Sequence, residues 1–142
     1  MGGRPDCRSG FDELLAFEFT EPAAFGPVHH LTVACFFLQH PDGHTLDALA
    51  MWRRMISDPA AGGAHAQEAL PAMHAAFYGP TRVREPGALP PAWWPAAWPL
   101  TVWDAFPSHG EVFDAAGHVE RVQAWARAVG SALDASDPTR HA

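Results

Sequence analysis

The pattern of apolar and polar positions changes at residue 26, where a segment that is apolar on nearly every side begins. This segment, GPVHHLTVACFFLQHP at 26–41, predicts a helix over about residues 27–39. The helix should end at His40-Pro41, because a residue before proline disfavours α-helical geometry. Helices that are apolar on several sides are buried, so we expect this one at the centre of the fold. One stripe of it is formed by Val28, Leu31, Cys35 and Leu38.

Helical spacing of apolar residues predicts further helices on both sides of this segment. The first begins near Ser9 or Asp12 and continues to about Phe19. Thr20, Glu21 and Pro22 are expected to close it, with Gly26-Pro27 starting the next helix. Three more helices are expected over 46–56 with Thr45 as N-cap, over 64–78 with a kink at Pro71, and over 118–133.

Residues 80–100 contain no helical pattern and are rich in proline and tryptophan, which predicts a long irregular connection. Trp93, Trp94 and Trp98 are expected to be docked on the protein, because three exposed indoles would favour aggregation. Thr101-x-x-Asp104 resembles a capping box with Asp in place of Glu, and predicts a short helical turn after the connection.

These elements predict an all-α fold, a bundle of four to five helices with the Trp/Pro-rich connection packed over one end. Ala is abundant and β-branched residues are few, which favours helices over a sheet. The length of 142 residues favours a single helical domain over 1–142, with loose tails at 1–9 and 135–142.

The formal net charge of −7 excludes the electrostatic footprint of a nucleic-acid-binding protein, which needs clustered Lys and Arg. No run approaches the ~18 apolar residues of a membrane span. The N-terminal residues contain no apolar secretory segment, and two cysteines are expected to stay reduced, so the expected location is the cytoplasm. The sequence leaves open a small-molecule partner, a protein partner and a homo-oligomer.

Glu18 falls on the apolar stripe of the first helix, together with Phe11 and Leu14. A carboxylate there must be paired, or its pKa rises. Its simplest partner is an imidazole of the next helix, because the connection between the two helices is short, and the sequence predicts the pair Glu18–His29. The pair either stabilises the fold or supports a metal ligand. The wider candidate polar cluster comprises Glu18, His29, His30, Gln39 and His40.

A divalent metal such as zinc is the cofactor that these residue types would suit. The dense spacings CxxC and HxxxH are absent. His29 and His30 point roughly 100° apart on a helix, and His29 and His40 lie about 16 Å apart along its axis, so neither pair shares one ion. A metal site would therefore combine residues from several elements, and the candidates are His29, Glu18, Cys7, His74 and His118. The alternative is a set of ordinary hydrogen-bonded histidines.

Two further polar positions have simple structural interpretations. Cys35 has no histidine at helical spacing to activate it, and a thiol inside an apolar helix is an inert core residue by default. Gln39 is expected to cap carbonyl groups at the end of its helix. The motifs of nucleotide binding, serine hydrolysis and zincin chemistry are absent.

The segment FDELLAFEFTEPAAFGPVHHLTVACFFLQHP, with LTVWDAF at 100–106 and WARAV at 125–129, resembles an uncharacterised bacterial family of small helical proteins of unknown function. The family pattern resembles VHxLTVxxYxLQHP, and Cys7, Glu18, His29, Gln39 and His40 match it. Many members begin with a CPxCG element that this chain lacks, and residues 58–99 match poorly. If the cysteines of the family form a zinc site with a helix histidine, this chain retains little of it.

Three functions remain open from the sequence. The chain binds a divalent metal or small ligand through a buried His/Glu/Cys cluster, or it is a hydrolase or transferase, metal-dependent or acid/base, centred on Glu18 and His29. The third possibility is that the chain is a protein-interaction module that binds its partner through the Trp-rich connection. Whether it is an enzyme, and what its catalytic residues are, is undecided by the sequence.

Overall fold

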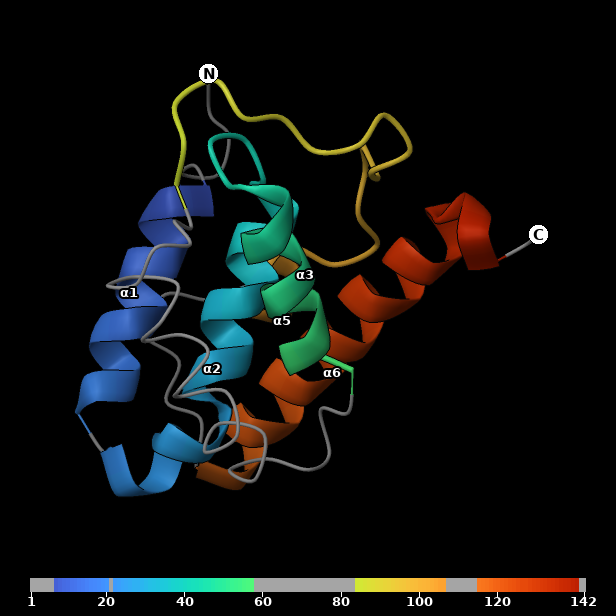
Figure 1. Cartoon of the computed structure of the whole chain (residues 1–142). Helices are drawn as coiled ribbons and strands as arrows, with labels where there is room; N and C mark the ends of the chain where they lie inside the picture. Colours follow the sequence, from blue (N-terminus) through green and yellow to red (C-terminus); the bar gives the residue numbers. More distant parts are fainter. Residues whose placement is uncertain (1–6, 21, 58–83, 107–114, 141–142) are drawn as a thin grey trace, which may run out of the picture.

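The computed structural model describes residues 7–20, 22–57, 84–106 and 115–140, which fold as helices gathered around α2 (Figure 1). The helices are α1 (Cys7–Phe19), α2 (Pro22–Gln39), α3 (Leu46–Met55), α5 (Val102–Ala105) and α6 (Ala115–Ser136), followed by the 3-10 turn η2 (Pro138–Arg140). In these ranges β-type pairing is limited to one isolated bridge between His44 and Arg84. The all-α prediction is confirmed, whereas the helix predicted over 64–78 lies outside the described residues.

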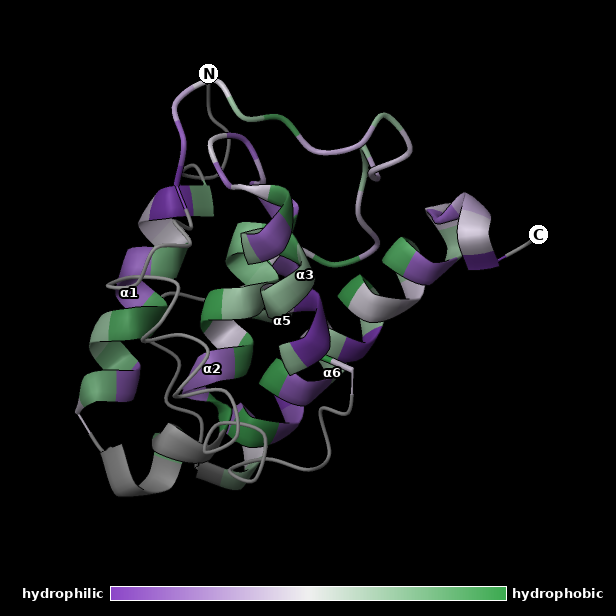
Figure 2. Ribbon diagram, viewed as in Figure 1, coloured by the Kyte–Doolittle hydropathy of each residue, from purple (hydrophilic) through white to green (hydrophobic). Residues whose placement is uncertain are grey.

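Helix α2 occupies the centre of the described fold, as its apolar character predicted. It packs against α6, α3 and α1, and its stripe of Val28, Leu31, Cys35 and Leu38 is fully buried. Figure 2 shows long hydrophobic stretches on α2 and alternating hydrophobic and hydrophilic patches on α6. The central position follows because a helix that is apolar on several sides needs a neighbour on each of them.

The start of α2 differs from the prediction. The helix begins at Pro22, five residues before the expected start at Pro27, so Gly26 and Pro27 lie inside it. Proline suits the first position of a helix, where its missing N–H would have no partner. At Pro27 the same missing N–H removes one helical hydrogen bond. The early start leaves only residues 20 and 21 between α1 and α2, which keeps the end of α1 beside the first turns of α2.

The described parts of the predicted tails, residues 7–9 and 135–140, are ordered, and the prediction of loose tails is wrong for them. Helix α1 begins at Cys7, and α6 continues to Ser136. Asp137 then accepts hydrogen bonds from the backbone N–H and the hydroxyl of Thr139, and its second oxygen accepts one from Arg53 of α3 at 2.8 Å. Hydrogen bonding to Arg53 and Thr139 lowers the pKa of Asp137 to about 2. Local sequence suggested fraying, but this ion pair with a distant helix fastens residues 137–140 to α3.

The predicted caps and the docking of the tryptophans are confirmed. Thr45 accepts a hydrogen bond from the N–H of Ala48, and Asp104 accepts one from the N–H of Thr101 at 3.0 Å. The described part of the connection, 84–100, contains no helix. Trp93, Trp94 and Trp98 are half-buried against the core, and the indole of Trp94 donates a hydrogen bond to the carbonyl of Leu38.

Two helical glycines predict opposite responses to alanine. A Cβ at Gly10 would lie 2.9 Å from the indole of Trp103 and 3.1 Å from Val102. We expect Gly10→Ala to lower the free energy of unfolding by about 1–3 kcal/mol, because a packed indole has little room to move. A Cβ at Gly130 would lie 3.8 Å from Ile56, an ordinary contact. Gly130→Ala should therefore raise the free energy of unfolding by about 0.5–1 kcal/mol through helix propensity.

Urea unfolding of the two variants beside the parent protein measures both changes. A Gly10→Ala protein as stable as the parent would contradict the close packing of α1 on α5.

Candidate functional site

The carboxylate of Glu18 lies at the last turn of α1 and is 2% exposed. One oxygen, Oε1, accepts a hydrogen bond from Nδ1 of His29 at 2.8 Å. The other, Oε2, accepts from the hydroxyl of Thr32 at 2.7 Å and from Nε2 of His118 at 2.7 Å. The three donors belong to α2 and α6, so a single carboxylate joins the three longest helices that the structure describes.

The pair Glu18–His29 that the sequence predicted is therefore present. His118, which was a candidate metal ligand, contacts the same carboxylate as a hydrogen-bond donor. Thr32 was missed by the sequence analysis. Its signal was its place three residues after His29, which puts both side chains on one face of the helix.

Hydrogen bonding keeps the buried carboxylate of Glu18 ionised. Burial by itself would raise the pKa of Glu18, but the hydrogen bonds from His118, His29 and Thr32 outweigh it and lower the pKa below its ordinary value. At neutral pH the carboxylate is therefore an anion that accepts all three hydrogen bonds. A buried anion with several good donors costs far less than an unpaired one.

His118 lies at the closed side of this cluster and is fully buried. The aromatic rings of Phe17, Phe25 and Phe106 surround its imidazole, with centroids 5.3, 4.5 and 5.0 Å away. Among the described residues, its Nδ1 finds no hydrogen-bond partner. Its Nε2–H points at the carboxylate of Glu18, so this histidine is held from one nitrogen by Glu18 and from its faces by aromatic rings.

His29 lies at the open side of the cluster. Its side chain is 33% exposed, whereas that of Glu18 is 1% exposed. Because Nδ1 donates to Glu18, the remaining nitrogen, Nε2, lies on the far side of the ring and carries the lone pair. The ring of Phe19 lies beside it, with a centroid distance of 5.2 Å. A carboxylate that holds one imidazole nitrogen fixes the tautomer and the direction of the other nitrogen.

Three members of the predicted polar cluster lie elsewhere. His30 is buried but neighbours His29 on the helix, so it points to a different side. The amide of Gln39 donates to the carbonyl of Leu100, and its oxygen accepts from the indole of Trp125 at 3.3 Å, so it links α2 to the connection and α6 and does not cap its own helix. His40 is exposed and contacts the carbonyl of Phe36 at 3.0 Å. Along α2, ten and eleven residues separate Gln39 and His40 from His29, about 15–16 Å.

Of the five predicted metal ligands, His29 and His118 both lie in contact with Glu18. Among the described residues, no group of three or more His, Cys, Asp or Glu side chains is placed to hold a metal ion. Cys7 stands at the opposite end of α1 from Glu18, about 16 Å away along the helix. His74 lies outside the described residues. Both oxygens of Glu18 accept hydrogen bonds, so His29 and His118 contact Glu18 as hydrogen-bond partners.

Cys35 has the inert environment that the sequence predicted. It is fully buried in α2, and burial raises the pKa of its thiol well above the ordinary value. The reactive form of cysteine is the thiolate, so this residue is a small core side chain and contributes no nucleophile.

Fold and site define an all-α protein whose helices meet at a buried carboxylate with two imidazole partners. The chain belongs to the family described as "Family of unknown function (DUF5946)", whose model matches residues 1–134. The predicted membership of a family of unknown function is thereby confirmed. Neither the curated proteins nor the solved structures provide a match to this chain. Within the described residues, no helix combines the length and the hydrophobicity needed to span a membrane.

Proposed function

We propose that the protein binds a small ligand at the exposed edge of His29 and exchanges a proton with it through Nε2. One observation supports this most directly: a buried, ionised carboxylate holds Nδ1 of an imidazole whose other edge reaches solvent. A carboxylate that holds Nδ1 fixes the tautomer of the ring and leaves Nε2 at the exposed edge, which is the arrangement of a general base. His118 and Thr32 hold the carboxylate in place.

This proposal favours acid/base chemistry over a metal centre. Among the described residues, a divalent ion such as zinc would find Nε2 of His29 as the exposed ligand of this cluster, since both oxygens of Glu18 accept hydrogen bonds. The net charge of −7 supports a small-molecule partner over a nucleic acid. We also propose that residues 1–142 form one domain and that the protein is located in the cytoplasm. The location is supported by two cysteines that form no disulfide.

Hydrolysis of p-nitrophenyl acetate tests the proton acceptor at His29. In the expected step, Nε2 takes a proton from water as the water oxygen bonds to the carbonyl carbon, and p-nitrophenolate leaves with the electron pair of the broken C–O bond. His29→Ala should lower the protein-dependent rate at least about tenfold, and Glu18→Gln should lower it by a smaller factor. The rate is read at pH 7 from p-nitrophenolate absorbance, with circular dichroism confirming that each variant is folded.

His40→Ala is the matched control, because His40 directly follows α2, is exposed and has no carboxylate partner among the described residues. Its rate should equal that of the parent. Equal losses in His29→Ala and His40→Ala would overturn the proposal, because any surface histidine would then serve. If zinc restores or raises the rate and EDTA abolishes it, the metal-dependent alternative replaces the acid/base one.

A further inference from the structure

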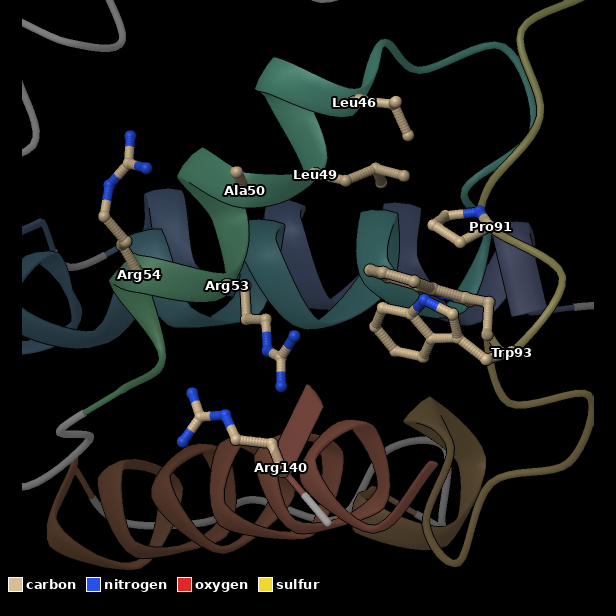
Figure 3. Close-up of a pocket in the computed structure, with 9 residues that line it drawn as sticks. Leu46, Leu49, Ala50, Arg53, Arg54, Pro91, Trp93 and Arg140 are labelled. Carbon is tan, nitrogen blue, oxygen red and sulfur yellow. The ribbon is translucent and has the colours of Figure 1, made fainter. Parts of the chain in front are cut away.

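A pocket of about 320 Å³ lies between α3, the connection at 91–94 and η2 (Figure 3). It is separate from His29: Trp94, one of its lining residues, donates a hydrogen bond to the carbonyl of Leu38, which lies about 14 Å further along α2 than His29. One wall is apolar and includes Leu46, which is 62% exposed, Leu49 and Trp93. A volume near the lower end of small-molecule sites suits a ligand of metabolite size.

The other wall of the pocket carries guanidinium groups. In Figure 3, Arg53 extends from α3 toward the C-terminal segment, and its guanidinium lies between Trp93 and the side chain of Arg140. Arg53 is held by Asp134 at 2.7 Å and Asp137 at 2.8 Å, and its guanidinium lies 5.7 Å from the centre of the Trp93 ring. Arg53 is therefore a fixed part of the wall, with its charge already balanced.

Arg140 differs from Arg53 because fewer of its guanidinium N–H groups contact a carboxylate. In the part of the chain that the structure describes, its guanidinium has one carboxylate contact, at 3.8 Å from Asp134, and its side chain is 59% exposed. Asp134 is shared, because it already pairs with Arg53 at 2.7 Å. A planar guanidinium with unused N–H groups suits a carboxylate, which can accept two of them side by side.

The charge distribution of the chain makes this pocket a selective place for an anion. The chain has nine cationic residues, all of them arginine, against sixteen acidic ones. Three of the nine, Arg53, Arg54 and Arg140, line this pocket, and none of the described lining residues is acidic. Asp134 and Asp137 balance the charge of Arg53. Arg54 and Arg140 therefore supply the positive charge of the pocket. A concave site with clustered positive charge attracts anions even when the whole molecule is acidic.

We propose that this pocket binds a small aromatic carboxylate, with its ring against Trp93 and Leu46 and its carboxylate on the guanidinium of Arg140. The apolar wall removes the ring from water, and the indole of Trp93 offers a flat face for stacking. Arg140 supplies the charge-assisted hydrogen bonds that distinguish the acid from a neutral molecule of the same shape. This site is independent of the acid/base pair at His29.

The test compares 1-naphthoate with 1-naphthylmethanol, a neutral molecule of nearly the same shape, by isothermal titration calorimetry of the full chain. We expect 1-naphthoate to bind at one site per chain, at least about tenfold tighter than the alcohol at ionic strength about 0.15 M. Arg140→Gln should weaken naphthoate binding about tenfold and leave the alcohol unchanged. Leu46→Ser should weaken both.

Arg127→Gln is the matched control, because Arg127 is exposed on α6 and does not line the pocket. It removes the same charge and should leave both affinities unchanged. Equal affinity for the acid and the alcohol would overturn the proposal in favour of a merely apolar patch. Equal weakening by Arg127→Gln and Arg140→Gln would overturn it in favour of a general charge effect. Binding of hexaglutamate without binding of naphthoate would assign the surface to an acidic peptide.

Discussion

Replacing Glu18 with alanine is expected to lower the free energy of unfolding by about 3–5 kcal/mol. The carboxylate accepts hydrogen bonds from His29, Thr32 and His118, and the last two are fully buried. Its removal leaves a buried hydroxyl and a buried ring N–H without an acceptor, together with a small cavity. Each unsatisfied buried donor costs about 1–3 kcal/mol. Urea unfolding at pH 7 measures the change.

Glu18→Gln separates charge from shape in this experiment. The amide keeps the size of the side chain but presents one oxygen and one NH2 group where two acceptor oxygens are needed, so an intermediate loss is expected. Glu120→Gln is the control, because Glu120 is exposed on α6 near His118 in sequence. A loss in Glu18→Ala no larger than in Glu120→Gln would show that the cluster contributes nothing to stability.

The stability that Glu18 contributes should depend on pH. The pKa of Glu18 in the folded protein is lower than its ordinary value of 4.5. A group with a lowered folded-state pKa contributes stability that is present above its unfolded pKa and is lost as the pH falls through the folded one. The stability difference between the parent and Glu18→Gln should therefore be constant near neutral pH and shrink below about pH 4.5. A difference that grows on acidification would contradict the ionised state of this carboxylate.

Replacing Trp125 with alanine is expected to lower the free energy of unfolding by about 3–5 kcal/mol as well. Trp125 is fully buried on α6, in the core that α2 and α3 share with this helix. The change removes the largest apolar side chain of α6 and leaves a cavity that rigid neighbouring helices fill only in part. It also deprives the amide oxygen of Gln39 of the indole donor.

Trp125→Phe keeps most of the packing and loses only the indole N–H and part of the volume, so a loss of about 1–2 kcal/mol is expected. Leu89→Ala is the control, because Leu89 is 69% exposed and should change stability by less than about 0.5 kcal/mol. The three free energies of unfolding come from the same urea titration. Similar losses in Trp125→Ala and Leu89→Ala would contradict the position of Trp125 in the core.

The contacts of Glu18 and those of Gln39 with Trp125 could be predicted from the sequence to different extents. Glu18–His29 could be predicted because a carboxylate on an apolar stripe needs a partner and the connection to the next helix is short. His118 lies one hundred residues further along the chain than Glu18, and a pairing at that separation leaves no periodic signal. Gln39 shows the reverse: its need for partners was evident, but which partners it finds depends on where Leu100 and Trp125 are brought by the fold.

The sequence by itself determined the all-α class, the central position of α2, the caps at Thr45 and Asp104 and the docking of the tryptophans, because periodicity, capping and hydrophobicity act within a few residues or on a whole helix. Tertiary structure alone decided that His118 joins Glu18, that Gln39 reaches Leu100 and Trp125, and that the end of α6 is fastened to Arg53. These outcomes depend on how the helices pack, and packing brings together side chains that no local spacing relates.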